Sequence, residues 1–103
     1  MGYNRHHSTA RLLFHSKRDY ENGEIVEFKA WEVPRSGIRP EGIKCSMVYI
    51  DTSGRRILGY DNAEGKGHHC HVGDEEIPIE FGSIGELLLK FLNEVGHLRG
   101  RHQ

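Results

Sequence analysis

Side chains that can exchange protons cluster between Gly59 and His71. The segment contains Asp61, Lys66, His68, His69 and His71. Histidine is the side chain that ordinarily gains and loses a proton near neutral pH, so three histidines in four positions indicate acid–base chemistry. His69 and His71 are two residues apart, so on a strand they share one face, whereas His68 points the other way.

Two glycines flank the lysine of this segment, in the order Gly65-Lys66-Gly67. Glycine has no Cβ, so the backbone can come close to a ligand there. Lys66 would then project from a tight loop beside that ligand, where an ammonium group can stabilise the charge of a phosphorane. The spacing is neither that of a P-loop nor that of a dinucleotide fingerprint. The loop therefore matches neither of these two phosphate-binding motifs.

The catalytic interpretation of the segment is phosphodiester cleavage. One histidine takes the proton of a ribose 2′-hydroxyl while another protonates the leaving 5′-oxygen. The predicted catalytic residues are His69, His71, Lys66 and Asp61. The predicted substrate-binding residues are Gly65, Gly67, His68 and Tyr60. Neither a metal ligand nor a cofactor is expected in this interpretation.

Two alternatives compete with catalysis for the same segment. In the first, Asp61 closes an Asx turn and the histidines are surface groups without a chemical role. In the second, His69 and His71 bind a metal ion. The third ligand would then be Asp61, Glu75 or Cys70. A zinc site needs three or four converging ligands, so the His-x-His spacing alone does not establish one.

The composition sets limits on the class of protein. The chain has 103 residues, with 14 Lys and Arg, 15 Asp and Glu, and a formal net charge of −1. That length predicts one domain, residues 1–103, and the charge balance argues against a general nucleic-acid coat. No apolar run approaches the roughly 20 residues that span a bilayer, and residues 1–7 lack the apolar core of a secretory signal. We therefore expect a cytoplasmic protein, in which Cys45 packs as a small apolar side chain.

Short segments rich in β-branched and aromatic residues predict an antiparallel sheet. Strands are expected at Ala10–Lys17, Glu24–Val33, Ile43–Asp51 and Arg55–Tyr60, with a short fifth strand at His69–Val72. Asn22-Gly23 is a strong hairpin signal, and the other connections are short enough to pair consecutive strands. Trp31 is expected in the core, although such a ring can also stack on a base. The acidic run Asp74–Glu76 is expected to be a solvated edge.

The C-terminal segment has the strongest helix signal. Ser83-Ile84-Gly85-Glu86 fits a capping box. An apolar stripe at helical spacing follows, formed by Ile84, Leu87, Leu88, Phe91, Leu92 and Val95. Gly96 is placed to end the helix, and residues 1–8 and 98–103 are expected to be mobile ends. We expect an α+β fold in which the stripe packs on one face of an antiparallel sheet of four to five strands; a groove for a partner protein is the alternative use of the stripe.

Fixed glycines, a lysine and paired histidines occur together in one ordered motif. The motif runs Gly59-Tyr60-Asp61-Asn62, Gly65-Lys66-Gly67, His69 and His71, followed by Pro78, Phe81 and Ser83 ahead of the helix. This pattern resembles the TumE family of small prokaryotic proteins, which are assigned as toxins of toxin–antitoxin pairs. Leu12–His15 and the hairpin into Glu27–Trp31 also fit. The resemblance implies a toxin with a cognate antitoxin.

The resemblance carries over three residues directly, namely Lys66, His69 and His71. At four other positions the chain departs from the family pattern: His68 replaces an aspartate, Cys70 an arginine, Ile79 a tyrosine and Lys90 an aspartate. By analogy with other toxins, the implied activity is metal-independent endoribonuclease cleavage by histidine acid–base chemistry, with RNA and an antitoxin as partners. The alternatives are a non-enzymatic module that binds an anion or a nucleic acid, and a metalloprotein with His69 and His71 as ligands.

Overall fold

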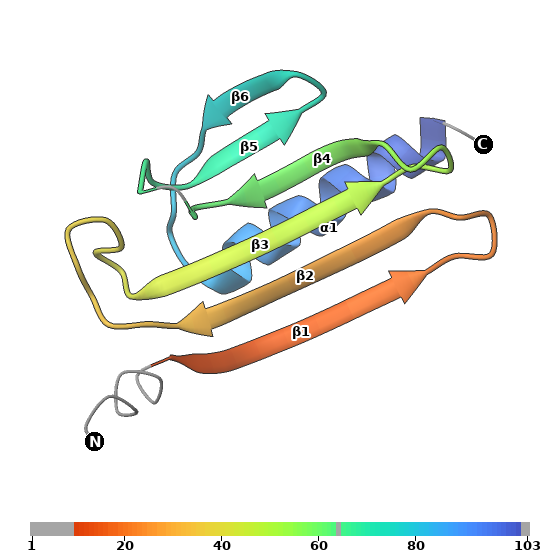
Figure 1. Cartoon of the computed structure of the whole chain (residues 1–103). Coiled ribbons are helices and arrows are strands. Elements are labelled where there is room, and N and C mark those ends of the chain that lie inside the picture. The colour runs from red at the N-terminus through yellow and green to blue at the C-terminus, as the bar shows by residue number, and fades with distance from the viewer. Residues whose placement is uncertain (1–9, 64, 102–103) are drawn as a thin grey trace.

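One helix lies against one face of a six-stranded antiparallel sheet in the computed structural model, which describes residues 10–63 and 65–101 (Figure 1). The elements are β1 (Arg11–Asp19), β2 (Ile25–Glu32), β3 (Ile43–Ile50), β4 (Arg56–Asp61), β5 (His69–Val72), β6 (Glu75–Pro78) and α1 (Ile84–Arg101). Each strand pairs with the next along the chain, in the order β1-β2-β3-β4-β5-β6. The α+β class and the packed C-terminal helix are confirmed. The mobile end expected at residues 1–8 lies outside the described residues.

The expected number of strands, four to five, is wrong because the acidic run that was expected to be a solvated edge continues into a sixth strand, β6. β6 pairs with β5, and Glu76 faces His71 across the pair. The turn between them is made by Gly73, whose φ of +60° suits glycine, and Asp74. The Gly-Asp dipeptide between two short runs is a hairpin signal. Two glutamates and a proline have low strand propensity, so pairing with β5 rather than local preference makes this segment a strand.

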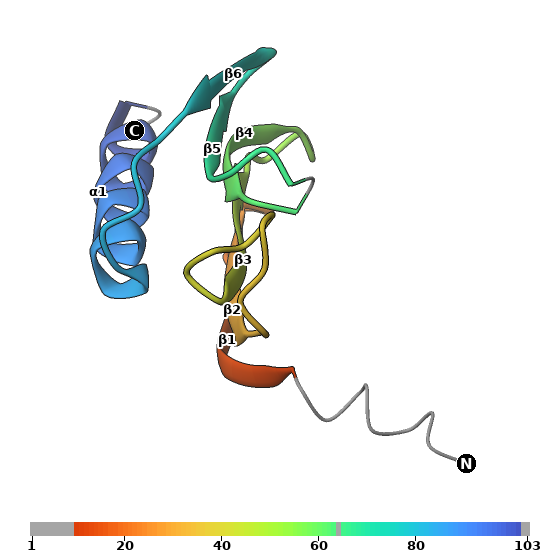
Figure 2. The same cartoon turned by 90° about the vertical axis from the view of Figure 1, so that its left-hand side faces the viewer.

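The core lies between α1 and the sheet face beneath it. Alternate residues of β3, namely Cys45, Met47 and Tyr49, are buried on this face, which confirms the apolar packing expected for Cys45. The other core side chains are Val26, Ala30, Leu58, Tyr60, Cys70, Leu87, Phe91 and Val95. Figure 2 shows α1 on one side of the sheet only. The opposite face, which we call the open face, is therefore available to position functional side chains.

Helix α1 begins as its sequence predicts. The Ser83 hydroxyl oxygen accepts a hydrogen bond from the Glu86 backbone N–H at 3.1 Å, which caps the first turn. Phe91 is fully buried, whereas Leu89 on the outer side of the helix is 65% exposed. The apolar stripe thus packs on the sheet rather than forming a free groove, except for Leu92, which lies at its exposed border. No helix within residues 10–63 and 65–101 has the length and apolar character needed to cross a membrane.

The expected end of the helix at Gly96 is wrong, because α1 continues to Arg101. Tertiary contacts of Arg99 stabilise this last part. The Arg99 Nε donates to the Glu24 carboxylate at 3.1 Å, and the guanidinium lies 3.7 Å from the centre of the Tyr20 ring. This ion pair and this cation–π contact stabilise the helical turn after Gly96, although a glycine often ends a helix. The partners are 75 residues apart in sequence, so no local pattern reveals them.

Glu24 gives this contact a pH dependence. Hydrogen bonds from Tyr49 and Asn22, together with the Arg99 guanidinium, hold the pKa of Glu24 below its ordinary value. The stabilisation from a lowered carboxylate pKa is complete above the unfolded value of about 4.3 and is lost as the pH falls through the folded-state pKa. We expect Glu24→Gln to cost about 1–3 kcal/mol at pH 7 and much less at about pH 3. Urea unfolding of both proteins at both pH values measures this, and an unchanged difference would contradict it.

Candidate active site

The strand register aligns a row of polar side chains across the open face. Consecutive pairings join His15 to Lys29, Lys29 to Ser46, Ser46 to Asp61 and Asp61 to His69. Facing residues of paired strands point to the same side of a sheet, so all five side chains lie on the open face. His71 is two residues after His69 in β5 and shares this face. The shared face that the sequence predicted for the two histidines is confirmed.

His71 lies between two carboxylates. Its Nε2 is 3.2 Å from Asp61 Oδ2 and 3.8 Å from Glu76 Oε2. Both oxygens favour the ring proton on Nε2, which leaves Nδ1 as the basic nitrogen of the neutral imidazole. Lys66 also contacts this cluster, because its Nζ lies 3.5 Å from the same Glu76 oxygen. Glu76 is the residue that sequence reasoning missed, and the Gly-Asp turn before β6 is the signal that places it opposite His71.

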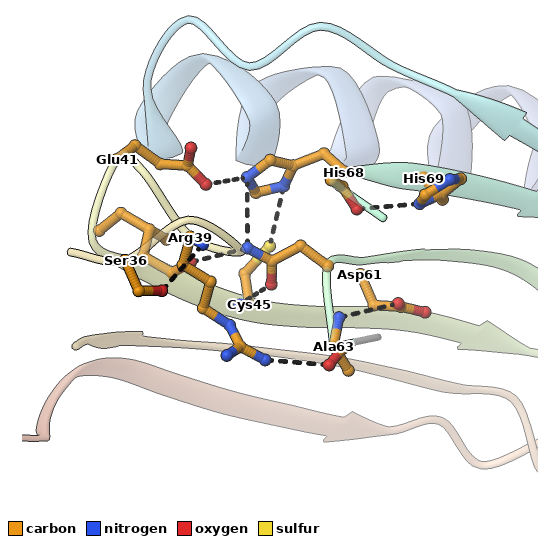
Figure 3. Close-up of polar contacts among 11 residues, drawn as sticks. Ser36, Arg39, Glu41, Cys45, Asp61, Ala63, His68 and His69 are labelled. Atoms are coloured by element: carbon orange, nitrogen blue, oxygen red, sulfur yellow. Dashed lines mark hydrogen bonds and ion pairs between the residues drawn. The ribbon is translucent and has the colours of Figure 1, made fainter. Parts of the chain in front are cut away.

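His69 is oriented by the backbone rather than by a carboxylate. Its Nδ1 lies 2.9 Å from the Gly67 carbonyl oxygen. A carbonyl can only accept, so Nδ1 donates, and Nε2 of the neutral ring keeps its lone pair. Figure 3 shows this contact at the end of the loop that leads into β5. His69 therefore presents a basic nitrogen that is separate from the His71 cluster.

The two glycines around Lys66 are required by the turn itself. Gly65 and Gly67 have φ values of +75° and +83°. A Cβ on Gly65 would lie 3.3 Å from the Ile38 side chain, whereas one on Gly67 would meet nothing within 4 Å. The backbone at Gly65, which was expected to come close to a ligand, thus comes close to the loop that contains Ile38. Gly67 has open space beside it.

The other two predicted substrate-binding residues lie away from the open face. Tyr60 is only 1% exposed and packs edge-to-face against Phe91, at 5.4 Å between ring centres. Its hydroxyl oxygen accepts a hydrogen bond from Lys90 at 3.3 Å. The His68 side chain is 4% exposed and stacks on Phe81 at 4.4 Å. The structure thus brings together Asp61, Lys66 and His71 through direct contacts. His69 shares their face of the sheet without a side-chain contact to them, and Tyr60 and His68 lie in the interior.

His68 belongs to a buried polar network that ties two loops together (Figure 3). Its Nε2 lies 2.8 Å from Glu41 Oε1, and its Nδ1 lies 3.8 Å from the Cys45 sulfur. The neutral tautomer with the proton on Nε2 satisfies both neighbours, since it donates to the carboxylate and accepts from the thiol. Burial raises the pKa of Cys45 to about 12, so this thiol keeps its proton. The network is structural and supplies no nucleophile.

Asn62 anchors the same network to β3. Its Oδ1 accepts from the Cys45 backbone N–H at 3.0 Å, and its Nδ2 donates to the Ile43 carbonyl at 2.7 Å. Asn62→Ala would leave both backbone groups unpaired, so we expect a loss of about 2–4 kcal/mol in the free energy of unfolding. Urea unfolding measures the loss, with Asn93→Ala on the exposed side of α1 as the matched control. Equal losses in the two variants would contradict this role of Asn62.

A cavity of about 330 Å³ opens beside the row of polar residues. It is lined by Lys29, Trp31, Lys44, Cys45, Ser46, Asp61 and Ala63. The expectation that Trp31 lies in the core is therefore wrong. The side chain is partly buried on the open face. The alternation in β2 does not indicate on which side of the sheet Trp31 lies, because neither face of the strand is cleanly polar. Asp61 lines the cavity and also contacts His71, so the cavity and the histidine cluster are adjacent.

The described residues give the metalloprotein alternative no support. Among them, no group of three or more His, Cys, Asp or Glu side chains is arranged to hold a metal ion. Cys70, offered by the sequence as a third ligand, is buried in the core on the other face of β5. The expectation that the protein needs no metal remains a prediction.

Comparison with protein-family models matches residues 4–99 to the family described as Toxin TumE. The chain belongs to the TumE toxin family. The match covers nearly the whole sequence and confirms the resemblance drawn from the motif. No curated protein and no solved structure matches the chain. Membership in TumE makes the chain a toxin component, which implies an antitoxin partner.

The matching residues Lys66, His69 and His71 lie at the open face. Two of the departures from the family pattern, His68 and Cys70, are buried. These two differences therefore change side chains in the interior of the protein. The matching side chains on the open face are unaffected.

Proposed function

We propose that this TumE protein is a metal-independent endoribonuclease toxin that uses histidine acid–base chemistry. The observation that carries the proposal is the pair of histidines on one face of β5, with Asp61 Oδ2 at 3.2 Å from His71 Nε2. A histidine oriented by a carboxylate is a common arrangement for proton transfer. A toxin that cleaves RNA would act in the cytoplasm, where its substrate is made.

In the proposed mechanism the two histidines have different roles. His69 Nε2 takes the proton of the 2′-hydroxyl, and the 2′-oxygen attacks the adjacent phosphorus. The bond from phosphorus to the 5′-oxygen then breaks, and protonated His71 gives its Nδ1 proton to that oxygen. Lys66 stabilises the charge on the non-bridging oxygens in the transition state. The products are a 2′,3′-cyclic phosphate and a free 5′-hydroxyl.

The end groups of the fragments test the proposal directly. Purified protein without a histidine tag should cleave single-stranded RNA in the presence of EDTA and leave 2′,3′-cyclic phosphate ends. RNA in which every 2′-oxygen is methylated should stay intact, because it has no nucleophile. Fragments ending in 3′-hydroxyl, or cleavage abolished by EDTA and restored by zinc, would contradict the proposed mechanism.

The second candidate function is a non-enzymatic nucleic-acid-binding module. The observation that favours it is the cavity beside the histidines, which combines an aromatic ring with Lys29 and Lys44. Such a module would bind RNA and leave it intact under all the conditions above. The same assay therefore separates the two candidates.

A further inference from the structure

The cavity next to Asp61 has a composition that the histidine chemistry does not explain. Trp31 and Lys44 face each other across β2 and β3, and Lys29 faces Ser46 two residues along the same strands. Among the described residues, neither lysine forms an ion pair or a hydrogen bond. An aromatic ring between two lysines has the chemistry of a nucleotide site, since a base stacks on the ring while the ammonium groups contact phosphates.

Arg39 adds a third cation at the rim of this cavity. Its Nη2 donates to the Ala63 carbonyl oxygen at 3.0 Å, and Ala63 lines the cavity (Figure 3). The Arg39 backbone N–H in turn donates to the Ser36 hydroxyl oxygen at 3.2 Å, which fixes the loop between β2 and β3. Lys29 and Lys44 thus line the cavity with Trp31, Arg39 binds a backbone carbonyl at its edge, and Asp61 is the one carboxylate among the lining residues. This local excess of positive charge complements a phosphate backbone.

We propose that this cavity is the subsite for an unpaired nucleotide of single-stranded RNA, whose base stacks on Trp31 and whose phosphates contact Lys29 and Lys44. The inference rests on the proposed function, because it places the substrate of the same site. Asp61 connects the two parts, since it lines the cavity and contacts His71. Three strand spacings of about 4.8 Å separate β2 from β5, so one strand of RNA can reach both Trp31 and the histidines.

Single-stranded RNA is the substrate class that the cavity fits best. Stacking on a side chain requires a base that has left its own stack, which the bases of a duplex have not. A sequence-specific duplex contact would need several side chains aimed at base edges, whereas this cavity offers one ring and two ammonium groups. Because every base has a stacking face, we expect little sequence preference from this subsite itself.

Trp31 is the only tryptophan of the chain and therefore reports on its own site. Titration of the full-length protein with a 2′-O-methylated single-stranded oligonucleotide, which cannot be cleaved, should quench the tryptophan fluorescence in a saturable way. A base-paired duplex of the same sequence should quench it far less. Equal quenching by both probes, or no saturable quenching, would overturn the assignment.

Variants measured by the anisotropy of the labelled oligonucleotide complete the test. Trp31→Ala should weaken binding by about 5- to 150-fold, and Trp31→Phe should restore most of it. Lys29→Gln and Lys44→Gln should each lower the slope of log affinity against log salt by about 0.7. Lys90→Gln, on α1 at the other side of the sheet, should bind as the wild type does. Wild-type affinity in the Trp31→Ala and lysine variants would overturn the subsite.

The binding test and the cleavage test fail independently. Binding of the uncleavable probe through Trp31, without cleavage of ordinary RNA, would reject the endoribonuclease and keep the subsite. Cleavage of RNA by variants of Trp31, Lys29 and Lys44 at wild-type rates would keep the endoribonuclease and reject the subsite.

Discussion

Replacement of His71 by alanine is expected to slow RNA cleavage by about 10²–10⁴-fold while binding of the uncleavable oligonucleotide changes little. The reason is that His71, with Nε2 at 3.2 Å from Asp61, acts on a proton in the transition state and not on the bound ground state. His69→Ala should have an effect of the same size. Single-turnover cleavage of a labelled RNA measures both rates, and growth arrest on expression should disappear in parallel.

His97 provides the matched control for these variants. It is an exposed histidine on α1, away from the open face. His97→Ala should cleave RNA at the wild-type rate, so any loss in the β5 variants is not a general effect of removing an imidazole. If His69→Ala and His71→Ala remain folded and cleave as fast as the wild type, the assignment of the site is wrong.

Phe91→Ala is expected to lower the free energy of unfolding by about 3–5 kcal/mol, the largest stability effect predicted for a single residue of this chain. The ring is fully buried and packs against Tyr60, so its removal leaves a cavity between α1 and the sheet. Urea unfolding followed by circular dichroism measures the loss. The size of the effect reflects that α1 is the one helix covering the core within the described residues.

Leu89→Ala is the control on the same helix. Leu89 is 65% exposed, and we expect a change within about 0.5 kcal/mol. Both variants place an alanine in the same part of α1, but only Phe91 packs on the sheet. The difference between their stability losses therefore measures packing rather than helix propensity. A loss below about 1 kcal/mol in Phe91→Ala, or equal losses in the two variants, would contradict the packing of α1.

The regular elements with local signals could be predicted well. The alternation of Cys45, Met47 and Tyr49 marked the buried face of β3, and the spacing from Ile84 to Val95 marked the buried side of α1. Elements that depend on contacts with residues far away in the sequence could not be predicted. The last turns of α1 depend on Arg99 meeting Glu24 and Tyr20, which are more than 70 residues earlier in the chain.

The sequence by itself determined the chemistry that is present in this protein and part of its placement. It identified the segment from Asp61 to His71, the shared face of His69 and His71, and the glycines of the loop, because strand periodicity and turn chemistry are local properties. It also carried the motif that matches the TumE family.

Only the tertiary structure decided which of these groups meet. Pairing of β5 with both β4 and β6 places Asp61 and Glu76 on either side of His71, and burial against Phe81 removes His68 from the surface. Whether the Trp31 side chain lies in the core or on the open face depended on which face of the sheet α1 covers. These outcomes depend on long-range pairing and on the choice between two sheet faces, and a residue's type and immediate neighbours specify neither.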